Sequence, residues 1–310
     1  MFTARKIQGA GGSGGNNKDR GVFGGGFSTP TRRNTIDYIT ISTTGNATDF
    51  GDLTVSRSTL AATSNGSRGV FGGGNTGSFS NVIDYIALST TGNATDFGDL
   101  TVGSIDLTAT SNGSRGVFGG GNGSVSTAMV LIDYITISTT GNATNFGNLT
   151  LGRRSLSATS NGSRGVFGGG EGSGGLYNTI DYITISTTGN AIDFGDLTVS
   201  RSTLAATSNG PRGVFGGGFD NSDSNTIDYI TIATTGNATD FGDLTVHRWS
   251  ISATSNGSRG VFGGGGALYA GTFSNVIDYI TISTTGNATD FGNLTVARRG
   301  LGATSGFTGA

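Results

Sequence analysis

Short apolar runs separated by glycine, asparagine and serine recur along almost the whole chain. Asn65-Gly66 separates two such runs, a combination typical of a tight hairpin whose turn needs positive φ. Thr91-Gly92-Asn93 predicts a second hairpin turn. The run Val82–Leu88 is apolar on both faces of its pleat, which favours a sheet packed between two neighbours. The pattern predicts four antiparallel strands in this segment: Leu60–Ser64, Arg68–Gly72, Val82–Ser89 and Ala94–Val102.

The same pattern occurs six times. The motif Arg-Gly-Val-Phe-Gly-Gly-Gly begins at Arg20, Arg68, Arg115, Arg164, Arg212 and Arg259. Four short strands repeated six times predict an all-β fold, a six-bladed β-propeller with four antiparallel strands per blade. The first copy lacks its own first strand, whereas an unmatched strand, 301–305, ends the chain. We expect this C-terminal strand to complete the first blade and so to remove the free sheet edges. The predicted organisation is a glycine-rich N-terminal arm, 1–19, followed by the propeller, 20–310.

Composition removes several classes of function. The chain of 310 residues has 59 glycines, no cysteine and a single histidine, His247, so we expect no disulfide, no metal site and no cofactor. The net charge is −2 and both lysines lie in the arm, which argues against nucleic acid as a partner. Neither an apolar leader nor an 18-residue apolar stretch is present. We therefore expect synthesis in a cytoplasm without a signal peptide, and no membrane insertion.

Comparison of the six copies separates the repeated scaffold from two variable regions. The first is the loop after each Gly-Gly-Gly: 27–34, 75–81, 122–130, 171–178, 219–225 and 266–275. The second is the link after each Leu-Thr-Val or Leu-Thr-Leu: 56–58, 103–106, 152–154, 200–202, 247–249 and 297–299. In a four-stranded antiparallel blade, both regions emerge at the same end. We expect them to share one face of the propeller, where any local function would lie.

Arginine and aromatic residues are the candidate binding residues on that face. Arginine occupies the same link position in five of six copies, so it is expected to ring the mouth of the central channel. Guanidinium groups interleaved with flat rings suit anionic sugars. The candidate ligand-binding residues are Arg32, Arg33, Arg57, Phe79, Arg153, Arg154, Tyr177, Arg201, Phe219, Arg248, Trp249, Tyr269, Phe273, Arg298 and Arg299. The alternative is that the five repeated arginines belong to the blade motif and bond to Asp52-type residues or to loop carbonyls.

Three further positions allow more than one interpretation. The aspartates that open the third strand, such as Asp84, are hypothesised to accept hydrogen bonds from the Gly-Gly-Gly amides. Trp249 is equally consistent with a sugar platform and with packing at the channel rim. Aspartate pairs of the Asp49–Asp52 type recur in four of the six copies, whereas a glycosidase needs one asymmetric pair. We therefore expect no enzyme and no catalytic residue, and a carbohydrate-active enzyme is the least favoured function.

The repeat resembles the kelch family in the order Arg57, Val70-Phe71-Gly72-Gly73, Ile83-Asp84-Tyr85, Thr91-Gly92-Asn93 and Asp96-Phe97. The likeness covers residues 20–305, with phenylalanine where kelch units usually carry tryptophan. The amino-acid sequences of the repeats also resemble those of repeat-bearing proteins of tailed marine bacteriophages, which are regarded as virion or tail-fibre components. That resemblance implies a virion location.

These observations favour a non-catalytic virion protein, of the tail-fibre or receptor-binding type, that displays variable loops for recognition of a host-surface glycan or protein. The alternative is a purely structural subunit of a virion or surface assembly. The expected partners are other virion proteins, contacted through the N-terminal arm, and an anionic host-surface glycan. Membership of a homo-oligomer or larger assembly is also expected.

Overall fold

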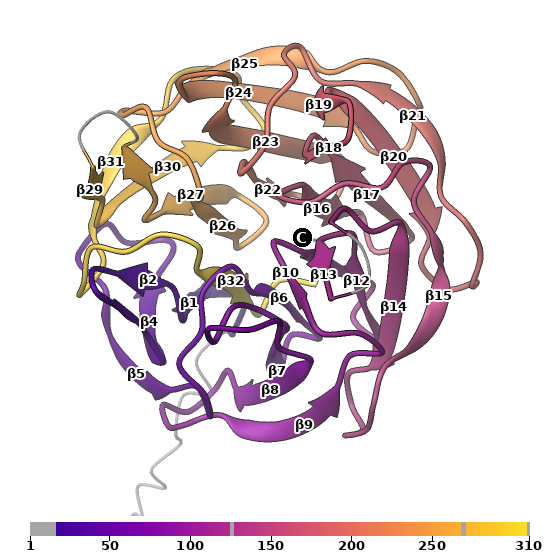
Figure 1. Ribbon diagram of the computed structural model, residues 1–310. Helices are drawn as coiled ribbons and strands as arrows, with labels where there is room; N and C mark the ends of the chain where they lie inside the picture. Colours follow the sequence, from indigo (N-terminus) through magenta and orange to yellow (C-terminus); the bar gives the residue numbers. More distant parts are fainter. Residues whose placement is uncertain (1–16, 125–126, 268–270, 309–310) are drawn as a thin grey trace, which may run out of the picture.

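The computed structural model describes residues 17–124, 127–267 and 271–308, and it shows a closed ring of six four-stranded antiparallel sheets (Figure 1). The prediction of a six-bladed propeller is confirmed. Each blade is one sheet, in the orders β32-β1-β4-β5, β6-β7-β8-β9, β11-β12-β14-β15, β16-β17-β20-β21, β22-β23-β24-β25 and β26-β27-β30-β31.

The strands take equivalent positions in every blade. The innermost are β32 (Gly302–Ser305), β6 (Ala61–Ser64), β11 (Thr108–Ser111), β16 (Ser157–Ser160), β22 (Ala205–Ser208) and β26 (Ser252–Ser255). The second are β1 (Arg20–Gly24), β7 (Arg68–Gly72), β12 (Arg115–Gly119), β17 (Arg164–Gly168), β23 (Arg212–Phe219) and β27 (Arg259–Gly263). The third are β4 (Thr35–Thr40), β8 (Val82–Ala87), β14 (Leu131–Thr136), β20 (Thr179–Thr184), β24 (Asp223–Thr231) and β30 (Val276–Thr281). The outermost are β5 (Thr48–Asp52), β9 (Thr95–Asp99), β15 (Thr144–Asn148), β21 (Ile192–Asp196), β25 (Thr239–Asp243) and β31 (Thr289–Asn293).

One 3-10 turn and several two-residue strands lie outside the six main sheets. A single 3-10 turn, η1 (Asn17–Asp19), precedes β1. The variable regions contain β2 (Phe27–Ser28), β3 (Thr31–Arg32), β10 (Ser104–Ile105), β13 (Asn122–Gly123), β18 (Glu171–Gly172), β19 (Gly175–Leu176), β28 (Gly266–Ala267) and β29 (Thr272–Phe273). Of the expected arm, 1–19, only η1 falls within the described residues. Its Asp19 accepts hydrogen bonds from Ser42 N and Asn256 Nδ2, both at 2.9 Å, and so ties the first blade to the sixth.

The hydrophobic core lies between blades, in six clusters. One cluster joins Val22, Ile36 and Phe50 of the first blade to Phe71 and Ile86 of the second. Both faces of the third strand are buried, as its sequence predicts, because each blade is covered by a neighbour on either side. The glycine that ends each second strand makes this close packing possible. A Cβ on Gly72 would lie 2.5 Å from Cε1 of Phe118 in the next blade.

Hydrogen bonds between blades protect the outermost strands. Gly92 N donates to Phe50 O at 2.8 Å, Ala94 N donates to Asp52 O at 2.7 Å, and Asn93 Oδ1 accepts from Asp52 N at 3.0 Å. The Thr-Gly-Asn turn of one blade thus covers the edge of the blade before it. Covered edges matter in this chain, because nearly identical exposed strands would pair between molecules.

The arginine that begins each second strand has the structural role its sixfold repetition suggests. The Arg68 guanidinium carbon lies 4.4 Å from the centroid of the Tyr85 ring, within the range of a cation–π contact. Its Nη1 donates to Ser138 O of the next blade at 3.1 Å. Equivalent contacts connect the other blades.

Two continuous belts of hydrogen bonds surround the central axis. At one end, a serine hydroxyl from each innermost strand donates to the serine carbonyl of the preceding blade at 2.5–2.7 Å, and Ser64 to Ser305 completes the circle. At the other end, backbone amides donate around the ring at 2.6–3.0 Å, beginning with Thr59 N to Gly300 O. The serine belt needs Ser305 of the C-terminal strand, which pairs with β1 over Gly302–Ser305, and the amide belt closes through Gly300 just before that strand.

Closure can be tested by removing the C-terminal strand and then restoring it at the other end of the chain. A protein truncated after Gly300 leaves β1 without its partner and breaks the serine belt. We expect a lower melting temperature and concentration-dependent association, measured by calorimetry and light scattering. A permutant that starts at residue 301 and joins Ser305 to Arg20 through Asn-Gly-Ser, the turn of the other blades, should melt like the native chain. Native-like melting of the truncated protein would contradict this account.

Candidate functional site

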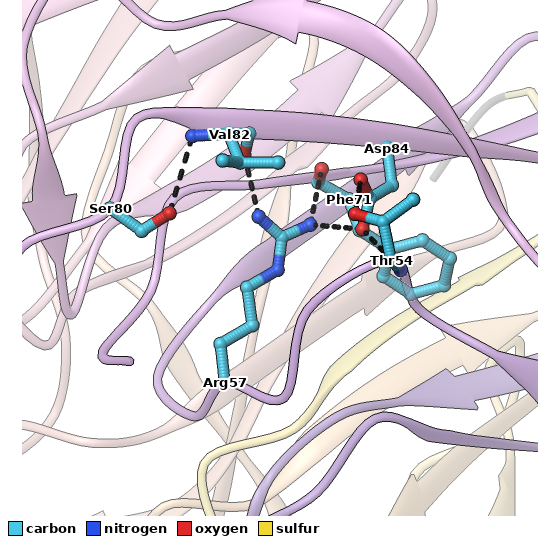
Figure 2. Close-up of polar contacts among 6 residues, drawn as sticks. All are labelled: Thr54, Arg57, Phe71, Ser80, Val82 and Asp84. Carbon is cyan, nitrogen blue, oxygen red and sulfur yellow. Dashed lines mark hydrogen bonds and ion pairs between the residues drawn. The ribbon is translucent and has the colours of Figure 1, made fainter. Parts of the chain in front are cut away.

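The five repeated arginines do not ring the channel mouth, because their side chains are fully buried between blades. Arg57 Nη2 lies 2.9 Å from Asp84 Oδ2 and donates to Phe71 O at 3.1 Å, while Nη1 donates to Val82 O at 2.6 Å (Figure 2). Thr54 Oγ1 donates to the same carboxylate at 2.5 Å. The equivalent ion pairs are Arg153–Asp181 at 2.6 Å, Arg201–Asp228 at 2.8 Å, Arg298–Asp37 at 3.1 Å and Arg248–Asp278. The prediction that these five arginines contact a ligand is therefore wrong.

The alternative interpretation, that these arginines belong to the blade motif, is correct, but the expected carboxylate partner is not. The arginines do bond to backbone carbonyls, yet their carboxylate is the third-strand aspartate rather than the Asp52 type. The hypothesis that this aspartate accepts from the Gly-Gly-Gly amides is also wrong. Gly25 N donates to Thr35 O and Gly26 N to Arg57 O, so backbone carbonyls already satisfy these amides.

The junction between the second and third blades lacks this ion pair. Ser104 occupies the arginine position, so buried Asp133 receives side-chain and amide hydrogen bonds from Thr101 alone, at 2.7–3.0 Å. Ser104 Oγ has no partner among the described residues, and a void of about 10 Å³ lies between Ser104, Met129 and Asp133. Burial raises the pKa of Asp133, since no cation offsets the desolvation of its carboxylate.

The two variable regions share one face, as expected. Antiparallel bridges join the link that enters each blade to the variable loop of that blade, at Ser58–Asn75, Arg154–Glu171, Ser202–Phe219, Trp249–Gly266 and Phe27–Arg299. We call this side of the ring the loop face. We call the residues that follow the repeated arginine position the rim: Ser58, Ile105, Arg154, Ser202, Trp249 and Arg299.

A half-buried cluster of one cation and three aromatic rings forms part of the rim. The Arg299 guanidinium carbon lies 4.2 Å from the Trp249 ring centroid, 5.7 Å from that of Phe273 and 5.8 Å from that of Phe27. Phe27 and Phe273 meet edge to face at 5.8 Å. Trp249 Nε1 and Arg299 Nε are buried and have no hydrogen-bond partner among the described residues. A half-buried guanidinium group stacked on aromatic rings is the feature that makes this cluster a candidate site for a polar ligand.

A second charged group lies on the rim at the link between the third and fourth blades. Arg154 Nε forms an ion pair with Glu171 Oε1 at 2.9 Å, and these side chains are 37% and 33% exposed. Asp106 lies one residue beyond the rim, facing the axis. Burial raises the pKa of Asp106 to about 6, Arg154 and Arg299 lower it, and Glu171 raises it. The electrostatic coupling shows that these four charges act on a common region at the channel mouth.

A central cavity of about 110 Å³ opens beneath the rim. Its walls are six runs of four consecutive residues, each with a leucine or isoleucine in second position, from Thr59–Ala62 to Gly300–Ala303. Asp106 is the only charged residue in these walls. At the far end, the serine belt surrounds the axis, and residues 306–308 lie close to Gly66, Gly113 and Gly257 of three different blades. We conclude that a ligand would enter from the loop face.

The other candidates lie on the loop face but are not brought together. Arg32 pairs across β2–β3 with Phe27, next to the aromatic cluster. Arg33 Nε donates to Ser28 Oγ at 2.6 Å, and the Tyr177 hydroxyl accepts from Gly174 N at 3.1 Å. Phe219 is half-buried against the link at Ser202.

The last two candidate binding residues are Phe79 and Tyr269. Phe79 is 40% exposed. Tyr269 lies outside the described residues.

The sequence prediction missed Asp106 and Glu171 as members of the site. The available signal was their departure from the repeat. Asp106 stands where the other links have Thr59, Ser155, Thr203, Ser250 and Gly300, and Glu171 is the only glutamate of the chain.

No protein-family model matches this chain, and no curated protein is significantly similar to it. Within the described residues, no helix is long and apolar enough to span a membrane. In the same residues, no group of three histidine, cysteine, aspartate or glutamate side chains is arranged to hold a metal ion.

The two kinds of blade junction can be compared by matched substitutions. Asp84→Asn leaves Arg57 buried without a counter-charge, which costs about 3–5 kcal/mol of unfolding free energy. Asp133→Asn removes a carboxylate that has no cation, so we expect unchanged or higher stability at pH 7. The sign follows from the raised pKa, since the folded state then holds the proton more tightly and loses stability as pH rises. Denaturant unfolding at pH 4.5 and 7 measures both effects, and equal losses in the two variants would contradict them.

Proposed function

We propose that this protein is a non-catalytic recognition propeller of a tailed-bacteriophage virion, and that its rim binds an anionic host-surface glycan. The observation that carries the proposal is the position of the residues that break the repeat. Glu171, Trp249 and Asp106 each occur in one copy only, arginine occupies the rim position in two copies, as Arg154 and Arg299, and all five lie around one channel mouth. Other blades close without them, with serine at the rim position in two copies and threonine, serine or glycine at the position of Asp106.

The chemistry of the rim fits an acidic sugar. Arg154 and Arg299 are held about the axis by different links, and a guanidinium group pairs with a carboxylate through two parallel hydrogen bonds. Trp249, Phe27 and Phe273 offer apolar ring surface of the kind that covers a pyranose face. Trp249 is stacked on Arg299 at 4.2 Å, so it contributes both to the packing of the rim and to its apolar ring surface.

The non-catalytic part of the proposal rests on the ionisable groups of the cavity. Asp106 is the one carboxylate in the cavity walls, and Glu171 is occupied by Arg154. Glycoside hydrolysis requires a pair of carboxyl groups with separate roles. A kelch-like ancestry, virion location, synthesis in the host cytoplasm and attachment to other virion proteins through residues 1–19 belong to the same proposal.

A structural role is the second candidate, and one observation favours it. Large apolar side chains are exposed on the links of several blades: Val55 at 39%, Leu151 at 41%, Val199 at 40% and Val246 at 44%. Such side chains in equivalent positions offer contact area to a neighbouring subunit of a virion or surface assembly. In this role the loop face would be covered rather than free.

The proposal is tested by binding of uronic-acid oligosaccharides to the full chain, measured by glycan array and calorimetry. Arg154→Ala and Arg299→Ala each remove a charge-assisted hydrogen-bond donor, so we expect affinity to fall at least about tenfold. Trp249→Ala should also weaken binding. Ser202→Ala changes the same rim position of another blade and should leave affinity unchanged. Absence of binding, together with a loop face buried against another subunit in a particle reconstruction, would support the structural role instead.

A further inference from the structure

We infer that the ligand is zwitterionic: while its acidic group binds the rim arginines, a protonated amine of the same sugar enters the central cavity and pairs with Asp106. This inference rests on the proposed function and specifies its ligand class as a glycan that contains an amino sugar acid with a free amine.

The belt at this position is made by the backbone of Asp106; its carboxylate is not part of the belt, although Thr59 of the neighbouring link interacts with that carboxylate and lowers its pKa. The backbone amide of Asp106 donates to Thr59 O at 3.0 Å, and its carbonyl accepts from Ser155 N at 2.8 Å. The other five links make the same belt with threonine, serine or glycine, all at φ between 54° and 62°. Any of those residues would therefore complete the belt at position 106, and the acidic side chain requires another explanation.

The neighbouring charges do not form an ion pair with this carboxylate. No cation lies within 4 Å of it among the described residues, although Arg154 and Arg299 act on it from further away. Arg154 is directed to Glu171 at 2.9 Å, and Arg299 stacks on Trp249 at 4.2 Å. A half-buried carboxylate without a close cation is costly to ionise. A ligand that places a positive charge beside Asp106 offsets the free-energy cost of ionising this carboxylate.

The size and lining of the cavity indicate an ammonium group rather than a metal ion or a whole sugar. A volume of about 110 Å³ accommodates an amine and a few attached atoms, whereas a complete sugar ring remains at the rim. Hydroxyls of Thr59, Ser155, Thr203 and Ser250 also line the cavity and can accept from the three donors of an ammonium group. Calcium and magnesium prefer several oxygen ligands with more than one carboxylate, and the cavity walls hold only one.

The charges around the rim also favour a ligand that carries an amine as well as an acid. Two arginines and two acidic side chains, Asp106 and Glu171, are coupled around the mouth, so the site carries no net charge. A purely anionic ligand would meet repulsion from Asp106. A ligand with one charge of each sign can place its acid against an arginine and its amine against Asp106, and thereby satisfy both.

The test compares two sugars of nearly the same shape on the full chain by calorimetry and NMR titration. These are glucuronic acid and 2-amino-2-deoxyglucuronic acid. The second sugar carries an ammonium group where the first carries a hydroxyl. We expect the amino sugar acid to bind at least about tenfold more tightly at pH 7.5, a difference of one charge-assisted contact. The preference should decline as pH falls through about 6, because protonation of Asp106 removes its charge.

Asp106→Ser installs the residue found at this position in the third and fifth links, so the variant is expected to fold. It should abolish the preference and leave affinity for glucuronic acid unchanged or higher, and Asp106→Asn should do the same. Thr90→Ala, in the hairpin turn between β8 and β9 and so away from the loop face, should keep the preference. Equal binding of both sugars by the native protein would overturn the amine site while the proposed glycan function stands. Binding of neither sugar would overturn both.

Discussion

The ion pair between an arginine of one blade and an aspartate of the next is the interaction on which this propeller depends. Each guanidinium group fills the space where two blades and their link meet, and it satisfies carbonyls of the second and third strands besides the carboxylate. A buried charge pair gives little net stability over an apolar replacement, but losing one partner is very unfavourable. The pair therefore favours one docking geometry between neighbouring blades, because another arrangement would leave a buried charge without its partner.

The remaining contacts between blades follow from that docking. Once the junctions are set, the phenylalanine of one second strand packs over the terminal glycine of the previous one, and outer turns cover the neighbouring edges. The hydrogen-bond belts at the axis then close only when the sixth blade meets the first. Since β32 comes from the chain end and β1 from its beginning, ring closure joins the termini, and local order in each blade depends on the complete circle.

The fold could be predicted from the sequence because its signals are local and repeated. Asn-Gly turns, the Gly-Gly-Gly strand ends and the unmatched strand 301–305 each specify backbone geometry without knowledge of distant contacts. The site was less predictable, since periodic Arg57-type residues and irregular Arg154-type residues look alike in one dimension. Only the structure shows that Arg57 reaches Asp84, 27 residues away, whereas Arg154 stays at the surface. Asp106 was missed because its importance comes from what surrounds the axis, a property of all six links together.

Repetition makes the residues that depart from the common pattern easy to recognise in this molecule. In a ring of identical blades, an axial site would be lined by six equal side chains and would have no direction. Asp106 and Trp249 on separate links, with Arg154 and Arg299 on opposite sides of the ring, replace that symmetry with a fixed arrangement of charges and one aromatic wall. Such substitutions also affect the junction between blades. The link 103–106, between the second and third blades, carries Asp106 at the axis and also Ser104 in place of the buried arginine. That junction keeps an uncompensated Asp133 and a water-sized void. The least regular link is therefore the one that supplies the charged wall of the cavity, and the local loss of packing accompanies the gain of an asymmetric site.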